Sequence, residues 1–140
     1  MNGNPTVQVD TSIELRLLIS EQPALPLRVS LRYGAADPYA VTVRFHGPEE
    51  HVEWVFARDL LASGLNGHGG VGDVQVRAVP AGGADEVVII SLASPDGHAD
   101  LEASAAELRA FLHSTERVVP LGTEHRFFDI DAEVESLLAS

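Results

Sequence analysis

The chain has 140 residues, which is typical of a single domain (residues 1–140), and its 45% hydrophobic content is that of a globular protein with a core. Its 21 acidic residues outnumber its 9 basic residues, which are all arginine, and the formal net charge of −12 argues against binding to phosphate backbones or anionic membranes. The lack of cysteine excludes disulfides, thiolate metal sites and cysteine nucleophiles. The sequence shows no signal peptide and no apolar run near the roughly 20 residues that span a bilayer, so a cytoplasmic domain without direct membrane insertion is expected.

Period-two alternation predicts four strands in the first third of the chain. From position 7 to position 19 the odd positions are mostly apolar, while the even positions include Asp10, Glu14 and Arg16, as in a strand with one solvated face. The same alternation predicts strands at 25–33, 39–45 and 52–56, the last with Val52, Trp54 and Phe56 on one face. Short polar links join the four strands, which is typical of an antiparallel meander with Trp54 in its core.

The second half mixes helices and strands. Helical spacing predicts a helix at 58–65, ended by Gly64 and a glycine-rich loop at 66–70. Ser104 and Glu107 form a capping box that opens another helix, closed by Pro120. Further elements are predicted as strands at 73–79, 86–93 and 98–102 and as a last helix at about 131–139. This order predicts an α+β fold with two small antiparallel sheets and late helices.

Residue chemistry alone predicts no active site. No serine lies in a Gly-x-Ser-x-Gly elbow, and the glycine-rich segment 67–72 leads into a strand and is followed by no lysine. His46 and His51 flank a Gly-Pro turn and would meet only if the hairpin register allowed it. The histidines are interpreted as loop and surface residues (His46, His51, His68, His98, His113, His125). We therefore expect no catalytic residues, no cofactor and no metal, and the alternative of a hydrolase or metal enzyme is disfavoured.

Four stretches resemble a known family: LRYGAADPYAV (31–41), EWVFARDLLASGL (53–65), GVGDVQV (70–76) and GTEHRFFDIDAEVESLL (122–138). They are similar to the SsgA-like sporulation and cell-division proteins of actinomycetes, and most similar to the SsgB branch of that family. The resemblance covers about residues 10–138. It rests above all on the combination of Asp-Pro-Tyr-Ala-Val with Glu-Trp-Val-Phe-Ala-Arg-Asp-Leu-Leu.

The resemblance implies a regulator that is not an enzyme. Such proteins bind the tubulin-like GTPase FtsZ, promote its assembly and recruit it to septum sites. The family's fold implies a whirly-like domain assembled as a bell-shaped homotrimer. An SsgA-like paralogue and a membrane partner are further implied, with a location in the cytoplasm at division septa.

Six residues match the family's motifs and are the candidates for a protein-interaction surface: Asp37, Tyr39, Arg58, Asp59, Arg126 and Asp129. A purely structural interpretation stands beside this one. In that interpretation Asp37 holds a turn, Arg58 pairs with Asp59, and Arg126 offsets the acidic residues around it.

A second function, single-stranded nucleic-acid binding of the whirly type, is the alternative. Four arginines at even positions are predicted on the outer face of the first strands: Arg16, Arg28, Arg32 and Arg44. Asp10 and Glu14 share this face and dilute its positive charge. With a net charge of −12 and no lysine, no nucleic-acid partner is expected.

Overall fold

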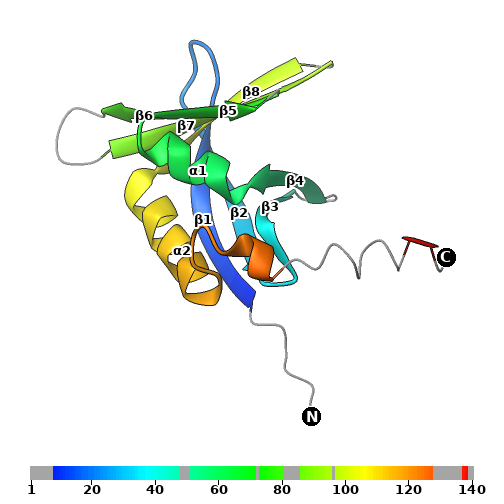
Figure 1. The fold of residues 1–140 in the computed structure, drawn as a ribbon. Helices are drawn as coiled ribbons and strands as arrows, with labels where there is room; N and C mark the ends of the chain where they lie inside the picture. Colours follow the sequence, from blue (N-terminus) through cyan, green and yellow to red (C-terminus); the bar gives the residue numbers. More distant parts are fainter. Residues whose placement is uncertain are drawn as a thin grey trace.

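One antiparallel sheet of eight strands forms the framework of the described chain, in the order β4-β3-β2-β1-β8-β7-β6-β5 (Figure 1). The computed structural model describes residues 8–47, 51–71, 73–80, 86–95, 97–127 and 137–138. The strands are β1 (Gln8–Leu18), β2 (Leu25–Gly34), β3 (Asp37–His46), β4 (His51–Ala57), β5 (His68–Val71), β6 (Val74–Pro80), β7 (Glu86–Ser94) and β8 (Gly97–Ser104). The helices are α1 (Arg58–Leu65), α2 (Ala105–Val118) and the short 3₁₀ helix η1 (Glu124–Arg126).

The prediction of two separate sheets is wrong, because β1 joins both halves. This strand pairs with β2 along nearly its whole length, and its last residues, Arg16–Leu18, pair with Asp100–Glu102 of β8. Since so short a ladder connects the halves, their strands diverge and the sheet curls, as Figure 1 shows for β1 and β2 against β5–β8. The result is still an α+β chain in which strands predominate, with the helices inside the curl.

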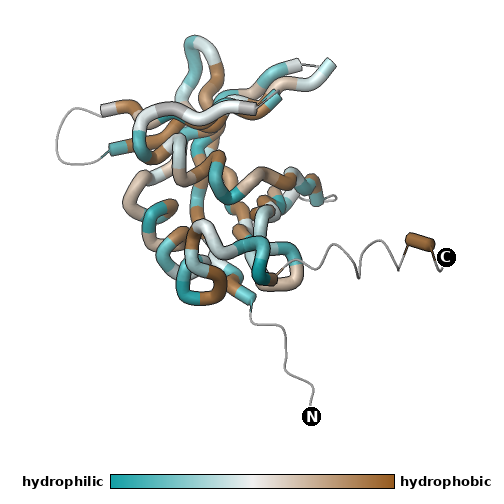
Figure 2. Tube along the Cα trace, viewed as in Figure 1, coloured by the Kyte–Doolittle hydropathy of each residue, from teal (hydrophilic) through white to brown (hydrophobic). Residues whose placement is uncertain are grey.

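The predicted strands and the two predicted helices within the described residues are otherwise confirmed. Figure 2 shows the alternation of apolar and polar residues along the strands. Their apolar faces meet α1 and α2 in one core, which includes Ile13, Leu31, Val43, Val76, Ile90, Leu101, Leu61, Leu108 and Phe111. Ser104 accepts a hydrogen bond from the Glu107 backbone N–H, as the capping box predicts, and α2 buries Leu108, Phe111, Leu112 and Thr115. The predicted helix at 131–139 lies outside the described residues, except for Leu137 and Leu138.

The sequence interpretation missed β5, which was predicted as a loop. Glycines make up half of this strand and give it no apolar alternation. Their lack of a side chain is what lets β5 pack against α1, since a Cβ at Gly69 would lie 2.9 Å from the Leu60 carbonyl oxygen. Neither α1 nor α2, nor any other helix in the described ranges, is long and apolar enough to cross a bilayer.

Candidate interaction surface

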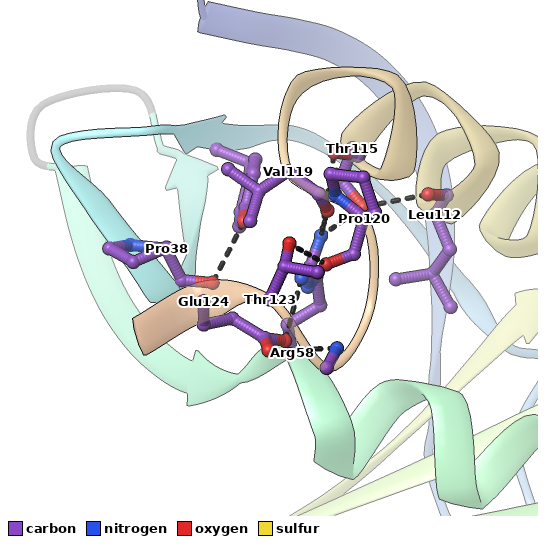
Figure 3. A network of polar contacts seen from close by, with 10 residues as sticks. Pro38, Arg58, Leu112, Thr115, Val119, Pro120, Thr123 and Glu124 are labelled. Carbon is purple, nitrogen blue, oxygen red and sulfur yellow. Dashed lines mark hydrogen bonds and ion pairs between the residues drawn. The ribbon is translucent and has the colours of Figure 1, made fainter. Parts of the chain in front are cut away.

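Arg58 lies at the centre of a buried polar network that joins four elements (Figure 3). It is the first residue of α1 and follows β4 directly, so its side chain enters the space between α1 and the end of α2. The guanidinium donates to the Val119 carbonyl oxygen at 2.6 Å and to Glu124 Oε2 at 2.6 Å. It also lies 4.8 Å from the centroid of the Tyr33 ring on β2, within reach of a cation–π interaction.

The remaining contacts of this network satisfy most of its polar atoms. Arg58 donates weakly, at 3.4 Å, to the carbonyl and hydroxyl oxygens of Thr115. Glu124 Oε1 accepts from the Gly122 backbone N–H at 2.9 Å, and the Tyr33 hydroxyl donates to the Pro38 carbonyl oxygen at 2.8 Å. The network therefore fixes the segment after α2 against β2, β3 and α1. With side-chain exposures of 1% for Arg58 and 10% for Glu124, it holds the chain together and presents no open face to a ligand.

Two pKa values reflect this environment. The hydrogen bond from Arg58 is the main cause of the lowered pKa of Glu124, and backbone N–H donors add to it against the opposing effect of burial. Burial raises the pKa of Tyr33, and the nearby Arg58 charge partly offsets that rise. Both groups therefore hold one protonation state near neutral pH, with Glu124 ionised and Tyr33 neutral.

We expect acid to weaken this network through Glu124. Because the folded-state pKa lies below the ordinary value of 4.5, the stabilising contribution is fully present above that value. It is lost as the pH falls through the folded-state pKa. The difference in free energy of unfolding between the wild-type chain and Glu124→Gln should shrink on acidification, as measured by urea denaturation. Glu86→Gln, at an exposed pair with Arg109, is the control, and an unchanged Glu124→Gln difference at acid pH would contradict the expectation.

The structure separates the six predicted surface residues into three groups. Asp37, Tyr39, Asp59 and Arg126 are exposed, and they lie on β3, α1 and η1, the elements that meet around the Arg58 network. We call these four residues the polar end. The prediction that Arg58 belongs to an exposed surface is wrong, because its guanidinium is wholly buried and pairs with Glu124 rather than with Asp59. Asp129 lies outside the described residues.

Sequence reasoning missed Glu124 and Tyr33 as partners of Arg58. Glu124 lies 66 positions away from Arg58, in a segment where its charge resembles that of the other acids. In the sequence, Tyr33 is simply the last apolar position of the strand predicted at 25–33. The placement of Arg58 directly after a strand and before the apolar pair Leu60 and Leu61 was the one local signal that it could point inward.

The arginines on the outer face of β1–β3 are largely neutralised. Arg16 pairs with Glu102 at 3.3 Å and Arg32 with Asp10 at 3.4 Å, while Arg44 pairs with Glu53. Within the described part of the chain, Arg28 is the one of the four arginines without an ion-pair partner. A phosphate-binding face needs uncompensated positive charge, so this arrangement disfavours the nucleic-acid alternative.

The histidine pair of the β3–β4 hairpin does meet. His46 and His51 are register partners, and their ring centroids lie 5.3 Å apart in an edge-on arrangement. Ser30 Oγ lies 2.7 Å from His46 Nε2. Among the described residues, no three His, Asp or Glu side chains gather in a way that could hold a metal ion.

An open apolar groove lies where the core face of the sheet extends beyond the helices. Its volume is about 420 Å³. Its lining comes from both halves of the sheet: Leu17, Leu27, Phe45, Val52, Trp54, Leu92, Ala93, Ser94, Gly97, His98, Ala99 and Leu101. Along β4 the side chains become steadily more exposed toward the groove, from buried Phe56 through half-buried Trp54 to Val52, which is 50% exposed. The predicted core position of Trp54 is therefore confirmed in part, since it packs on the core and also lines the groove.

Comparisons with known proteins agree with the sequence resemblance. The family model described as Streptomyces sporulation and cell division protein, SsgA, matches residues 27–124. The sporulation-specific cell division protein SsgB of Streptomyces coelicolor is 52% identical over 132 residues, covering 94% of this chain and 96% of the relative. SsgB of Kineococcus radiotolerans is 44% identical, covering 94% of this chain and 81% of the relative.

Solved structures show the same fold. A structure from work relating mutations in SsgB to longitudinal cell division during sporulation of Streptomyces coelicolor matches with a TM-score of 0.84 and 49% identity, covering 91% of this chain and all of that one. The crystal structure of an SsgA-like sporulation-specific cell division protein from Thermobifida fusca matches with a TM-score of 0.85 and 38% identity, covering 96% of this chain and 98% of that one.

Proposed function

Because the chain belongs to the SsgA family of sporulation and cell division proteins, we propose that it is a sporulation-specific regulator that binds FtsZ, recruits it to septum sites and promotes its assembly. The observation that carries the proposal is the high identity to SsgB across nearly the whole chain. The FtsZ part rests on the family resemblance of the sequence motifs. The exposed polar end supports a protein-binding role, because it presents a tyrosine and an arginine, two residue types enriched in interfaces, on the neighbouring elements β3 and η1.

Multivalent binding is the mechanism that we propose. In a whirly-like homotrimer, three identical polar ends would raise the local concentration of FtsZ subunits, so that individually weak contacts bridge neighbouring filaments. The protein would act in the cytoplasm at division septa. An SsgA-like paralogue and a membrane partner would complete the assembly, and no nucleic acid is needed.

Co-sedimentation with FtsZ from the same organism tests this proposal. With GTP the protein is expected to pellet with the filaments and to increase the amount of pelleted FtsZ, whereas with GDP it should stay in the supernatant. Tyr39→Ala is expected to weaken binding at least about fivefold, because tyrosine is enriched among the few interface residues whose truncation costs more than about 1 kcal/mol. Tyr39 is 48% exposed, so the variant should fold normally.

Arg28→Ala is the matched control, because Arg28 lies on the outer face of β2, away from the polar end, and forms no ion pair with any residue that the structure describes. If the wild-type protein stays in the supernatant with GTP and leaves filament mass unchanged, direct FtsZ recruitment is wrong. Binding to single-stranded oligonucleotides with a steep salt dependence would then favour the alternative function. If Tyr39→Ala and Arg28→Ala behave alike, the polar end is not the contact.

A further inference from the structure

The two histidines of the β3–β4 hairpin meet on the outer face of the sheet. His46 is the last residue of β3, His51 is the first residue of β4, and the two are register partners. Because side chains alternate along a strand and Val52 lines the apolar groove, His51 lies on the opposite face. Both histidines are exposed, so a ligand can reach the pair from solvent.

The separation of the two rings fits two imidazoles bound to one metal ion. At a tetrahedral ion with Zn–N distances of about 2.0–2.1 Å, the centroids of two imidazole ligands lie about 5.2 Å apart. The ring centroids of His46 and His51 lie 5.3 Å apart, with the ring planes at 87°. Each ring can turn about its own metal–nitrogen bond, so a steep angle between the planes is compatible with this geometry. The pair therefore holds its rings at the spacing that an ion requires.

Ser30 on β2 orients the ring of His46. The Ser30 Oγ lies 2.7 Å from His46 Nε2. With the ring proton on Nε2, His46 donates to Ser30 and keeps the lone pair of Nδ1 free, and metal-binding histidines typically donate through their second ring nitrogen in this way. Since β2 and β4 lie on opposite sides of β3, a ring whose Nε2 points to Ser30 carries Nδ1 on the side of His51.

The charges around the pair permit a bound cation. Glu53 shares the outer face with His51, but its carboxylate accepts from Arg44 Nε at 2.8 Å, so these two charges cancel. Arg28, exposed on β2, opposes a cation, whereas the net charge of −12 attracts one. Within the described ranges, no third His, Asp or Glu completes a ligand set. The pair therefore supplies two ligands, and water fills the remaining positions of the ion.

We propose that His46 and His51 form a binding site for a divalent transition-metal ion of the zinc class, with His46 Nδ1 and one ring nitrogen of His51 as ligands. Imidazole suits such ions, whereas Mg²⁺ and Ca²⁺ prefer oxygen ligands. The site departs from the expectation of no metal, because that expectation left the hairpin register open and the register brings the two rings together. This inference concerns the chain alone and does not rest on FtsZ binding.

Calorimetric titration of the untagged full-length chain with Zn²⁺ tests the site. We expect the wild-type chain to bind one Zn²⁺ and to show no binding of Mg²⁺. His46→Ala and His51→Ala should each abolish saturable binding at the same zinc concentrations, and both variants should fold normally because the side chains are exposed. The controls His98→Ala and His113→Ala each remove an exposed histidine beside a carboxylate, and they should keep the wild-type affinity.

Ser30→Ala separates metal binding from a simple contact between rings. It keeps both imidazoles but removes the partner of His46 Nε2, so it is expected to weaken zinc binding about tenfold, the lower end for outer-shell partners. A wild-type chain that binds no Zn²⁺ would reduce the pair to an edge-to-face ring contact and overturn the proposal. Undiminished binding in His46→Ala or His51→Ala would also overturn it, because the ion would then be held elsewhere. An unchanged affinity in Ser30→Ala would contradict the assignment of Nδ1 as the ligand atom.

Discussion

Replacing Arg58 with methionine is expected to lower the free energy of unfolding by about 3–5 kcal/mol, the cost typical of removing one partner from a buried ion pair. The side chain is fully buried, so water cannot take over its role. The loss leaves the Glu124 carboxylate with only neutral backbone N–H donors, such as that of Gly122, and removes the 2.6 Å donor of the Val119 carbonyl oxygen. Urea denaturation followed by circular dichroism measures the difference.

The control is Arg32→Ala, which breaks an exposed pair with Asp10 and is expected to cost less than about 1 kcal/mol. A double-mutant cycle sharpens the test. The double variant Arg58→Met/Glu124→Gln should be clearly less destabilised than the sum of the two single variants, because each single variant leaves one buried charge without its partner and the double variant leaves none. If Arg58→Met costs no more than Arg32→Ala, the buried network does not stabilise the packing of the segment after α2 against α1.

Most of the strands could be predicted from the sequence, because one face of β1, β2 and β3 is largely buried and the other is solvated. The order of the strands in the sheet could not be predicted, since the two halves are joined by Arg16–Leu18 pairing with a strand more than 80 positions away. Alternation determines which residues face the core, and it carries no information on which strands become neighbours. The glycine strand β5 lacks even that signal, because its two glycines have no side chain to alternate and Gly69 lies in close contact with α1.

The candidate surface could be predicted only for residues whose exposure follows the usual rule for their type, namely that charged side chains lie in solvent. Asp37, Asp59 and Arg126 are exposed, as expected for charged residues. Arg58 reverses this expectation, since its burial depends on a carboxylate, two carbonyl oxygens and an aromatic ring that come from distant segments. The groove was also not predictable, because residues such as Val52 and Trp54 follow the same alternation as the core. Only the position of the helices decides which apolar residues remain uncovered.

Gly64 in α1 is expected to tolerate no side chain, although alanine is normally the better helix former by about 1 kcal/mol. A Cβ at this position would lie 2.6 Å from Val76 Cβ and in collision with Val76 Cγ1 on β6. Val76 is fully buried, so it has no free space into which it could move. We expect Gly64→Ala to destabilise the chain by about 1–3 kcal/mol, the usual cost of overpacking a core, so that the steric effect outweighs helix propensity.

The partner variant Val76→Ala separates the two effects. On its own it should destabilise the chain by creating a cavity, but in combination with Gly64→Ala the new methyl group occupies part of that cavity. The double variant is therefore expected to be more stable than the sum of the single changes predicts, by a coupling of at least about 0.5 kcal/mol in urea denaturation. Simple additivity, or a stabilising Gly64→Ala, would mean that α1 can move away from β6. The glycine would then be explained by chain flexibility rather than by the close contact that joins this helix to the second half of the sheet.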